Sequence, residues 1–252
     1  MKASRSSIWL FALALLVACQ AGNGGLESEP AISDNALEPA ETAMEHMQTH
    51  FVEALAIREA IIGGDLHGVR KPGTWLAEHP AVSRMPSEWV PYVANLQAAA
   101  SLVATSRNLD EAASAMGSLT LSCGRCHSAL DATPTLERPP VPAATADARG
   151  RMLRHSWAAA RMWEGVVIPS DESWNLGTAV LSDAPMSPSK VAGDGPINPK
   201  LATLTQAVHQ LGTKASAEKD LVARGALFGA LLATCANCHR LTNAPVVRRR
   251  NQ

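Results

Sequence analysis

The sequence predicts an all-α protein built from two tandem four-helix units. Hydrophobic residues make up 46% of the 252 residues, enough for a sizeable core, whereas one Tyr and three Phe leave few aromatic side chains for a sheet. Alanine is abundant and runs of β-branched residues are short, which favours helix. The pattern of helical segments in the first half of the chain also recurs in the second half.

The first eighteen residues are typical of an export signal. Lys2 and Arg5 form a basic start, and the apolar stretch 8–18 is too short to span a bilayer comfortably. The segment 16–19, Leu-Val-Ala-Cys, resembles a bacterial lipobox, which implies cleavage before Cys19 and acylation of its thiol. Ordinary signal cleavage, which would leave a free cysteine, is the alternative. Gly and Pro in residues 19–40 indicate a flexible tether.

The first predicted unit covers residues 41–130. Its expected helices are 41–62, 66–78, 91–105 and 110–130. Two glycines, Gly63 and Gly64, should end the first helix, and Asn108 or Asp110 is a suitable N-cap for the last. Prolines punctuate the loop between the second and third helices.

A proline-rich linker, residues 131–146, leads to a second unit, 147–242, in which the pattern starts again. Its expected helices are 151–167, 170–182, 201–211 and 217–241, with a loop rich in Pro and Gly over 185–199. Residues 243–252 form a basic tail, most simply a solvated terminus.

The two units are related by an internal repeat. Met47 and His50 match Met152 and His155 at an offset of 105, as do two glutamates and two prolines further along. Near the end of each unit the offset is 112. The difference of seven fits an insertion in the longer loop of the second unit, so we interpret the halves as homologous.

Each unit ends in the pattern C-x-x-C-H. The first copy is Cys123, Cys126 and His127, and the second is Cys235, Cys238 and His239. Two thiols three residues apart lie on one side of a helical turn and can add to the two vinyl groups of one porphyrin, while the adjacent His binds the iron. We therefore expect two covalent haem c groups, with His127 and His239 as proximal ligands.

Two other kinds of site use C-x-x-C pairs. A four-cysteine zinc ribbon usually brings its pairs within about 15–20 residues, but here more than a hundred residues separate Cys126 from Cys235. A thioredoxin-like redox pair belongs to a strand-to-helix turn, whereas the flanks here are helical. Both alternatives are weaker than haem attachment.

The cysteine count and charge agree with an exported cytochrome. Five cysteines divide into two haem pairs and Cys19, which leaves none for a disulfide. The formal net charge is −1, and removal of a signal with two basic residues and no acidic one leaves about −3. The composition gives no indication of a nucleic-acid partner. Haem attachment takes place outside the bacterial cytoplasm, and Gln20 after the lipid-bearing cysteine is compatible with the outer membrane.

The distal ligand of each iron should come from the first helix of the unit. Only thirteen residues follow His239, and none is Met or His. Positions 47, 50, 54, 57 and 61 form an inward stripe of Met, His, Ala, Ile and Ile, and the second unit repeats it with Met152 and His155 at its start. The candidates are therefore Met47, His50, Met152 and His155. A buried imidazole needs a partner, which favours the histidines, although core packing of all four is the simpler alternative. The other histidines, His46, His67, His79 and His209, have no counterpart in the other half and are predicted to be surface or local structural residues.

Each half resembles a class II cytochrome c, the cytochrome c′ group. The resemblance covers about 41–130 and 147–242, and it implies a left-handed four-helix bundle with C-x-x-C-H in the last helix and the distal residue on the first. In low-spin members a first-helix Met binds iron, and in gas-binding members an apolar residue leaves the iron open. The family position falls on or beside Met47 and, by the repeat, Met152. The sequence departs from the family in its tandem arrangement and in the His one turn later.

The expected function is electron transfer by a lipid-anchored dihaem cytochrome outside the cytoplasm, with other redox proteins as partners. A catalytic role is less expected than a carrier role. A gas-binding protein, with open distal positions, and a dihaem peroxidase, with one open iron and acid–base groups beside it, are the alternatives. The close match of the two distal stripes argues against a division of labour between the haems.

Overall fold

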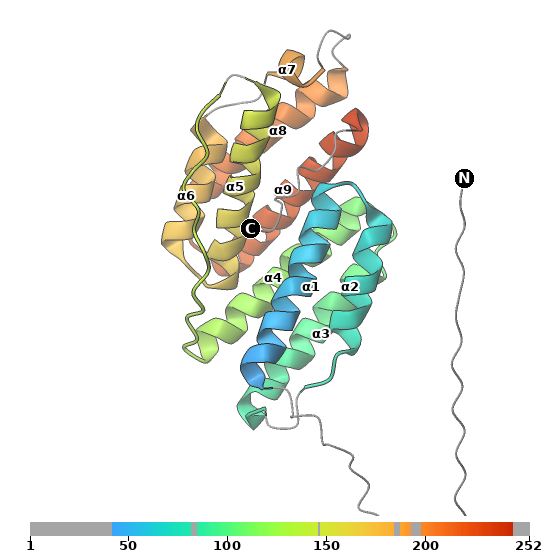
Figure 1. Cartoon of the computed structure of the whole chain (residues 1–252), viewed down its shortest axis with the longest axis vertical. Coiled ribbons are helices and arrows are strands. Elements are labelled where there is room, and N and C mark those ends of the chain that lie inside the picture. Colours follow the sequence, from blue (N-terminus) through green and yellow to red (C-terminus); the bar gives the residue numbers. More distant parts are fainter. Residues whose placement is uncertain (1–41, 82–84, 146, 184–186, 193–197, 244–252) are drawn as a thin grey trace, which may run out of the picture. The chain divides into compact units, whose positions relative to one another are not determined.

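The protein is all-helical in the part of the chain that the structure describes. The computed structural model describes residues 42–81, 85–145, 147–183, 187–192 and 198–243, and no strand occurs among them (Figure 1). The all-α prediction is thus confirmed. The expected signal 1–18, the tether with Cys19, and all but the first residue of the basic tail lie outside the described residues.

The helices correspond closely to the predicted ones. They are α1 (Ala43–Ile62), α2 (Leu66–Glu78), the short 3-10 helix η1 (Ser87–Trp89), α3 (Val90–Ala104), α4 (Leu109–Ala129), α5 (Ala148–Val167), α6 (Asp171–Asp183), α7 (Pro188–Ala192), α8 (Pro199–Ser216) and α9 (Leu221–Thr242).

The helix ends follow from local sequence. Thr42 and Glu45 form a capping box at the start of α1, and Gly64 ends the turn after α1 with φ of +72°, a conformation that favours glycine. Asn108, not Asp110, caps α4, and its side chain accepts a hydrogen bond of 2.9 Å from the Glu111 amide. Asp220 starts α9 by accepting from the Ala223 amide at 2.8 Å, so α9 begins four residues later than expected.

Two other elements differ from the prediction. The short helix α7 lies within the expected loop 185–199. Helix α8 does not end at residue 211 but continues to Ser216. It passes Gly212 because that glycine packs directly against α6: a Cβ added there would lie 2.7 Å from Cβ of Leu181. The glycine serves helix packing rather than helix termination.

The helices pack in two sets of four. In the first set α1 contacts α2, α2 contacts α3, α3 contacts α4, and α4 returns to α1. In the second set α5, α6, α8 and α9 make the same closed circuit. Helices α4 and α9, which carry the two cysteine motifs, also make the most extensive contact between the sets.

Helices α4 and α9 cross in antiparallel directions at a pair of close glycine contacts (Figure 1). A Cβ added at Gly117 would lie 2.5 Å from the carbonyl oxygen of Gly225, and one at Gly229 would lie 2.9 Å from that of Ala113. The repeat equates Gly117 with Gly229 and Ala113 with Gly225, so the two contacts are mutually equivalent. The crossing therefore has the pattern of a local two-fold axis. The motifs follow the crossing in each helix and point towards opposite ends.

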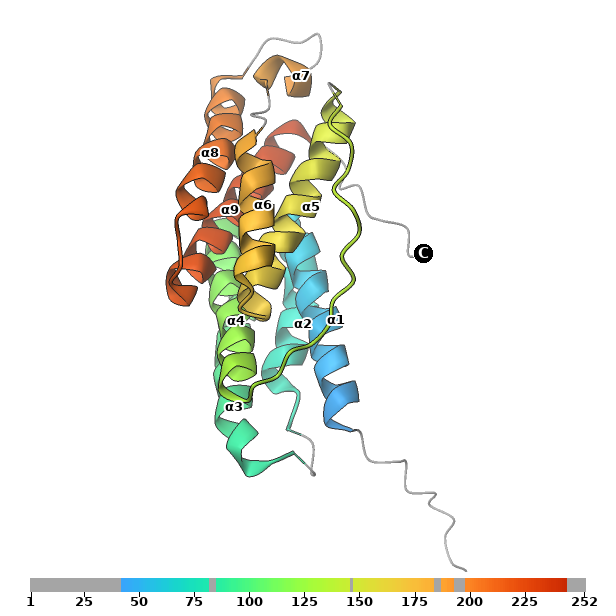
Figure 2. The ribbon, with the colours of Figure 1, turned by 90° about the vertical axis from the view of Figure 1, so that its left-hand side faces the viewer.

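The proline-rich segment 131–146 is an ordered strap where the structure describes it. It runs beside α5 from the end of α4 (Figure 2). The indole Nε1 of Trp157 donates to the carbonyl of Pro139 at 2.8 Å, and the guanidinium of Arg154 donates to that of Pro142 at 2.9 Å. Both hydrogen bonds run from side chains of α5 to backbone carbonyls of the strap, so the strap is bound to the second set of helices.

A buried carboxylate fixes the strap. Glu164 is 1% exposed and forms ion pairs with Arg138 of the strap at 2.6 Å and with Arg161 at 2.8 Å. The hydroxyl of Ser173 on α6 also donates to it at 2.9 Å. One side chain thus joins the strap to α5 and α6: its Oε1 accepts from Arg138 and Ser173, and its Oε2 forms the ion pair with Arg161.

Replacing Glu164 with Ala should lower the free energy of unfolding by about 3–5 kcal/mol, because it leaves buried guanidinium charge without its carboxylate. The matched control is Glu172→Ala, which removes an exposed carboxylate from the same Arg138 and should cost less than about 1 kcal/mol. Urea unfolding followed by circular dichroism measures both. Equal effects of the two changes would contradict the structural role of Glu164.

Helix α9 is long and apolar enough to cross a membrane by length and composition alone. It is a weak indication, because α9 packs against α4 and α8 and carries the second cysteine motif.

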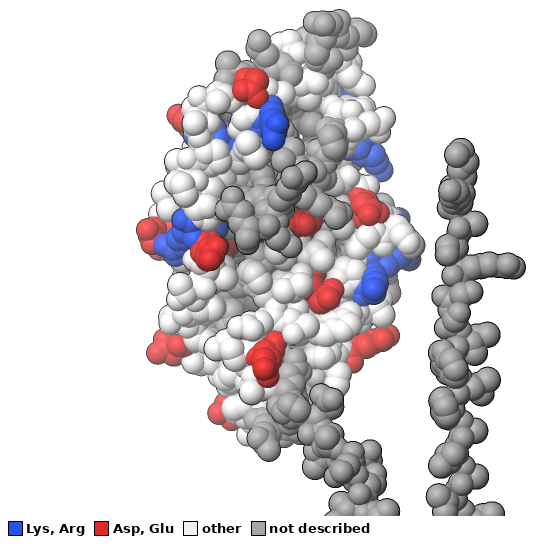
Figure 3. All heavy atoms as spheres, in the orientation of Figure 1, with Lys and Arg blue, Asp and Glu red and all other residues white. Residues whose placement is uncertain are grey.

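Acidic and basic side chains are dispersed over the face shown in Figure 3. Among the described residues on that face, charges of one sign do not gather into an extended patch.

Candidate haem pocket

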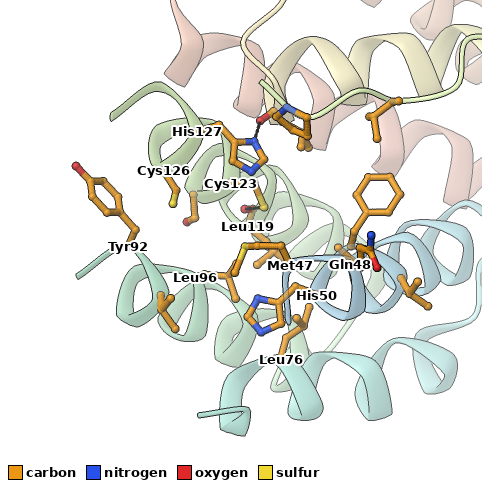
Figure 4. Close-up of a pocket in the computed structure, with 18 of the residues that line it drawn as sticks. Met47, Gln48, His50, Leu76, Tyr92, Leu96, Leu119, Cys123, Cys126 and His127 are labelled. Carbon is orange, nitrogen blue, oxygen red and sulfur yellow. Dashed lines mark hydrogen bonds between the residues drawn. The ribbon is translucent and has the colours of Figure 1, made fainter. Parts of the chain in front are cut away.

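The first motif lines a pocket in the first set of helices. Cys123, Cys126 and His127 lie on one face of α4, as the i, i+3, i+4 spacing requires. The pocket has a volume of about 430 Å³, in the range of small-molecule and cofactor sites (Figure 4). Its other walls are mostly apolar and come from α1, α2, α3, the strap and α5; they include Met47, Phe51, Leu76, Leu96, Leu136, Trp163 and Val167.

His127 is oriented by the other half of the chain. Its Nδ1 lies 2.6 Å from the carbonyl oxygen of Val167, the last residue of α5 (Figure 4). A carbonyl in the last turn of a helix lacks a helical partner and is available as an acceptor. The bond assigns the proton to Nδ1 and leaves Nε2 to bind a metal, the usual arrangement for a metal-binding His. Burial lowers the pKa of His127, against the opposing effect of the Val167 bond, so the imidazole is neutral as a ligand must be.

Burial disfavours the thiolate form of the four motif cysteines. Burial raises the pKa of Cys123 to about 12 and that of Cys235 to about 12. Burial also raises the pKa of Cys126 and of Cys238, and all four thiols are free. A redox pair needs a readily formed thiolate, so that alternative fits these buried thiols less well.

The second motif has a related setting at the other end of the crossing. Cys235, Cys238 and His239 lie on α9, with Ala236 fully buried between the cysteines. Gly64, just after α1, approaches this turn: a Cβ added there would lie 3.5 Å from the carbonyl oxygen of Ala236. In the first motif the roles are reversed, because Gly124 of the motif packs closely against the carbonyl of Val166 near the end of α5. Each motif is therefore covered by the end of the first helix of the other half.

The distal candidates of the first unit lie opposite His127. Met47 and His50 both line the pocket, and the Met47 side chain lies between His127 and His50 in the view of Figure 4. His50 is 4% exposed, and neither of its ring nitrogens has a hydrogen-bond partner among the described residues. Burial, together with the nearby His46 and His79, lowers the pKa of His50 to about 3. This imidazole is neutral, orphaned and therefore fit for a metal.

In the second unit the histidine is less buried than its counterpart in the first, whereas the two methionines are alike: Met47 is half-buried too. Met152 and His155 are half-buried, whereas Ala159, Met162 and Val166 of the same stripe are buried as expected. Burial, with the charges of Arg151 and Arg154, lowers the pKa of His155 to about 4. The two distal environments are therefore less alike than the sequence suggested, because basic residues occupy the second and histidines the first.

His46 is not a surface residue. It is fully buried and lies with His50 and His79 in one cluster. The sequence signal that points to this cluster is the i, i+4 spacing of His46 and His50 on α1; the contribution of His79 depends on how α2 packs. His67 is exposed and His209 lies 3.3 Å from the Leu181 carbonyl, in agreement with their predicted roles.

Comparisons with protein-family models, with curated proteins and with solved structures found no match to this chain.

Proposed function

We propose that the protein is an exported dihaem c-type cytochrome that carries single electrons between redox partners. The observation that carries the proposal is the pair of C-x-x-C-H motifs, each complete and each in the last helix of a four-helix set. We further propose that the two sets, 41–130 and 147–242, are homologous bundles of the cytochrome c′ type with one haem each.

The residues of the first pocket fit a covalent haem. Cys123 and Cys126 would hold the porphyrin by thioether bonds, and His127 would bind its iron through Nε2. The apolar walls would exclude water from the ring. A bound haem supplies a reversible one-electron change at iron, and the protein fixes the ligands and the exposure of the ring.

The distal residue of the first haem is proposed to be Met47. Its thioether lies on the His127 side of His50 (Figure 4). A sixth protein ligand keeps the iron low-spin and unreactive, as a carrier requires. The repeat extends the proposal to Met152 in the second unit, with His155 as the alternative there and His50 in the first.

The membrane anchor is part of the same proposal. The lipobox-like segment that ends at Cys19 supports acylation on the periplasmic side of a bacterial membrane, and the outer membrane fits Gln20. Bacterial lipoproteins carry more than one acyl chain, enough for stable binding.

Intact mass and haem-stained gels test the proposal on protein from the membrane fraction of an expression host that attaches haem c. Wild-type protein should carry two covalent haems, the Cys235→Ala/Cys238→Ala variant one, and the variant of all four motif cysteines none. Ser122→Ala, beside the first motif, is a control that should keep both. Wild-type protein with fewer than two haems would refute the dihaem proposal, and wild-type protein found only in the soluble fraction would refute the anchor.

A further inference from the structure

Three histidines lie close together next to the first pocket, on the side opposite His127. His46 and His50 lie one turn apart on α1, and His79 follows the end of α2. One ring nitrogen from each lies within 4.8 Å of the others, and Nε2 of His79 is 3.2 Å from Nδ1 of His46. Two of the three are buried, so the cluster is enclosed by protein.

The position of His79 is determined by its surroundings. Its backbone is extended, as expected for a residue before proline, and its amide still bonds to the Trp75 carbonyl at 2.9 Å. The imidazole stacks on the Trp75 indole with ring centroids 3.9 Å apart, and Gln97 donates to the His79 carbonyl at 2.7 Å. The ring is held towards α1 before any ligand binds.

We propose that His46, His50 and His79 bind one late first-row divalent metal ion, Zn²⁺ or Cu²⁺, as a centre separate from the haem irons. Imidazole is a preferred ligand of both ions, and three imidazoles leave a fourth position for water. Tetrahedral ligands at 2.0–2.1 Å from zinc are about 3.3 Å apart. The nitrogens of His46 and His79 already have that spacing at 3.2 Å, and the His50 nitrogen, which lies within 4.8 Å of them, needs to approach by up to about 1.5 Å.

The cluster is a feature of the first unit alone among the described residues. At the position of the repeat equivalent to His46 the second unit has Arg151, and a guanidinium cannot bind a metal. The third position falls on an alanine, residue 184, which lies outside the described residues. His155 thus has no partner set of this kind, and the centre would make the two units unequal.

The metal centre gives His50 a role that does not compete with the proposed iron ligand. A single His50 nitrogen cannot bind both the iron and the cluster ion. With Met47 on the iron, His50 completes the cluster, and one of its two nitrogens without a hydrogen-bond partner gains the metal as a partner. The inference goes beyond electron transfer, and it rests on the proposal that Met47 rather than His50 binds the first iron.

Titration calorimetry on the purified dihaem protein, after dialysis against a chelator, tests the site with Zn²⁺ and separately with Cu²⁺. We expect one site for each ion in wild type. His46→Ala and His79→Ala should each weaken binding at least 100-fold, with haem content and circular dichroism unchanged. His67→Ala, an exposed His on the same helix as Trp75, is the matched control and should bind as wild type. A crystal soaked in Zn²⁺ should show an anomalous peak about 2.0–2.1 Å from three imidazole nitrogens.

Three results would overturn the inference. One is wild-type protein with two haems that binds neither ion. Another is binding that survives both His46→Ala and His79→Ala. The third is a His50→Ala variant in which the haem spectrum changes to high-spin, because His50 would then be an iron ligand. Haem content is measured in every sample, so loss of metal binding is distinguished from failure of the haem proposal.

Discussion

Replacing Gly117 with leucine should lower the free energy of unfolding by about 3 kcal/mol, the upper part of the range for overpacked cores. A Cβ at this position would lie 2.5 Å from the carbonyl oxygen of Gly225, which is backbone and cannot move aside like a side chain. Glycine within a helix costs about 1 kcal/mol relative to alanine, so its presence in the middle of α4 is explained by the close crossing with α9. The clash exceeds the gain in helix propensity.

The control for this change is Ser118→Leu, at the next position of α4, where the side chain is exposed. It should alter the free energy of unfolding by less than about 0.5 kcal/mol. Gly229→Leu, on α9, should reproduce the Gly117 effect because the repeat places it at the equivalent contact, 2.9 Å from the Ala113 carbonyl. Urea unfolding of the three variants measures this. A Gly117→Leu protein as stable as Ser118→Leu would show that the helices do not cross at these glycines.

The same crossing explains why haem binding should depend on both halves. His127 is held by the carbonyl of Val167, and the turn at Ala236 is approached by Gly64. Each proximal side is thus completed by a helix from the other half. A chain of two independent domains would not have this dependence, and the compact packing of α4 against α9 provides it.

The helices and motifs were predictable because they depend on short-range patterns. The inward stripe of α1 places His50, Ala54, Ile57 and Ile61 in the interior as expected, since a period of 3.6 residues determines one face. The contacts of the strap with α5 were not predictable, nor was the contact of each motif with the end of the first helix of the other half, because both depend on residues far apart in the sequence. Gly117 illustrates what could not be predicted. Its match with Gly229 in the repeat was visible in the sequence, but the contact that requires glycine is made by another helix, α9.

The candidate site divides in the same way. The positions of the motif cysteines and of the histidine after each pair follow from motif spacing, whereas the burial of His46 and the approach of His79 follow from how α2 packs on α1. Residues without a counterpart in the repeat were predicted to be surface or local structural residues, and the burial of His46 excludes the surface position for it. The repeat identifies what both units share, and the histidine cluster is what they do not share.

The Met47→Ala variant should convert one of the two haems from low-spin to high-spin and open it to carbon monoxide. In the view of Figure 4 the Met47 side chain lies between His127 and His50, so we expect its thioether, rather than the His50 ring, to reach the iron of a haem held by Cys123 and Cys126. Met152→Ala should convert the other haem, and the double variant both. Absorption spectra of oxidised and reduced protein, with and without carbon monoxide, give the fraction converted.

Met44→Ala is the control for these changes, because Met44 lies one turn earlier on α1 and is 68% exposed. It should leave both haems low-spin. His50→Ala should also leave the first iron low-spin and change only its reduction potential. His50 is proposed to bind the cluster metal behind Met47, and its loss alters the charge and polarity near the iron without removing an iron ligand. His155→Ala should do the same for the second iron. If the histidine variants open the irons and the methionine variants do not, imidazole is the sixth ligand. That result would agree with the expectation that a buried imidazole needs a partner, and the histidine cluster would then lose its third member to iron. Wild-type protein that is already high-spin would reject all four residues as ligands and favour gas binding over electron transfer.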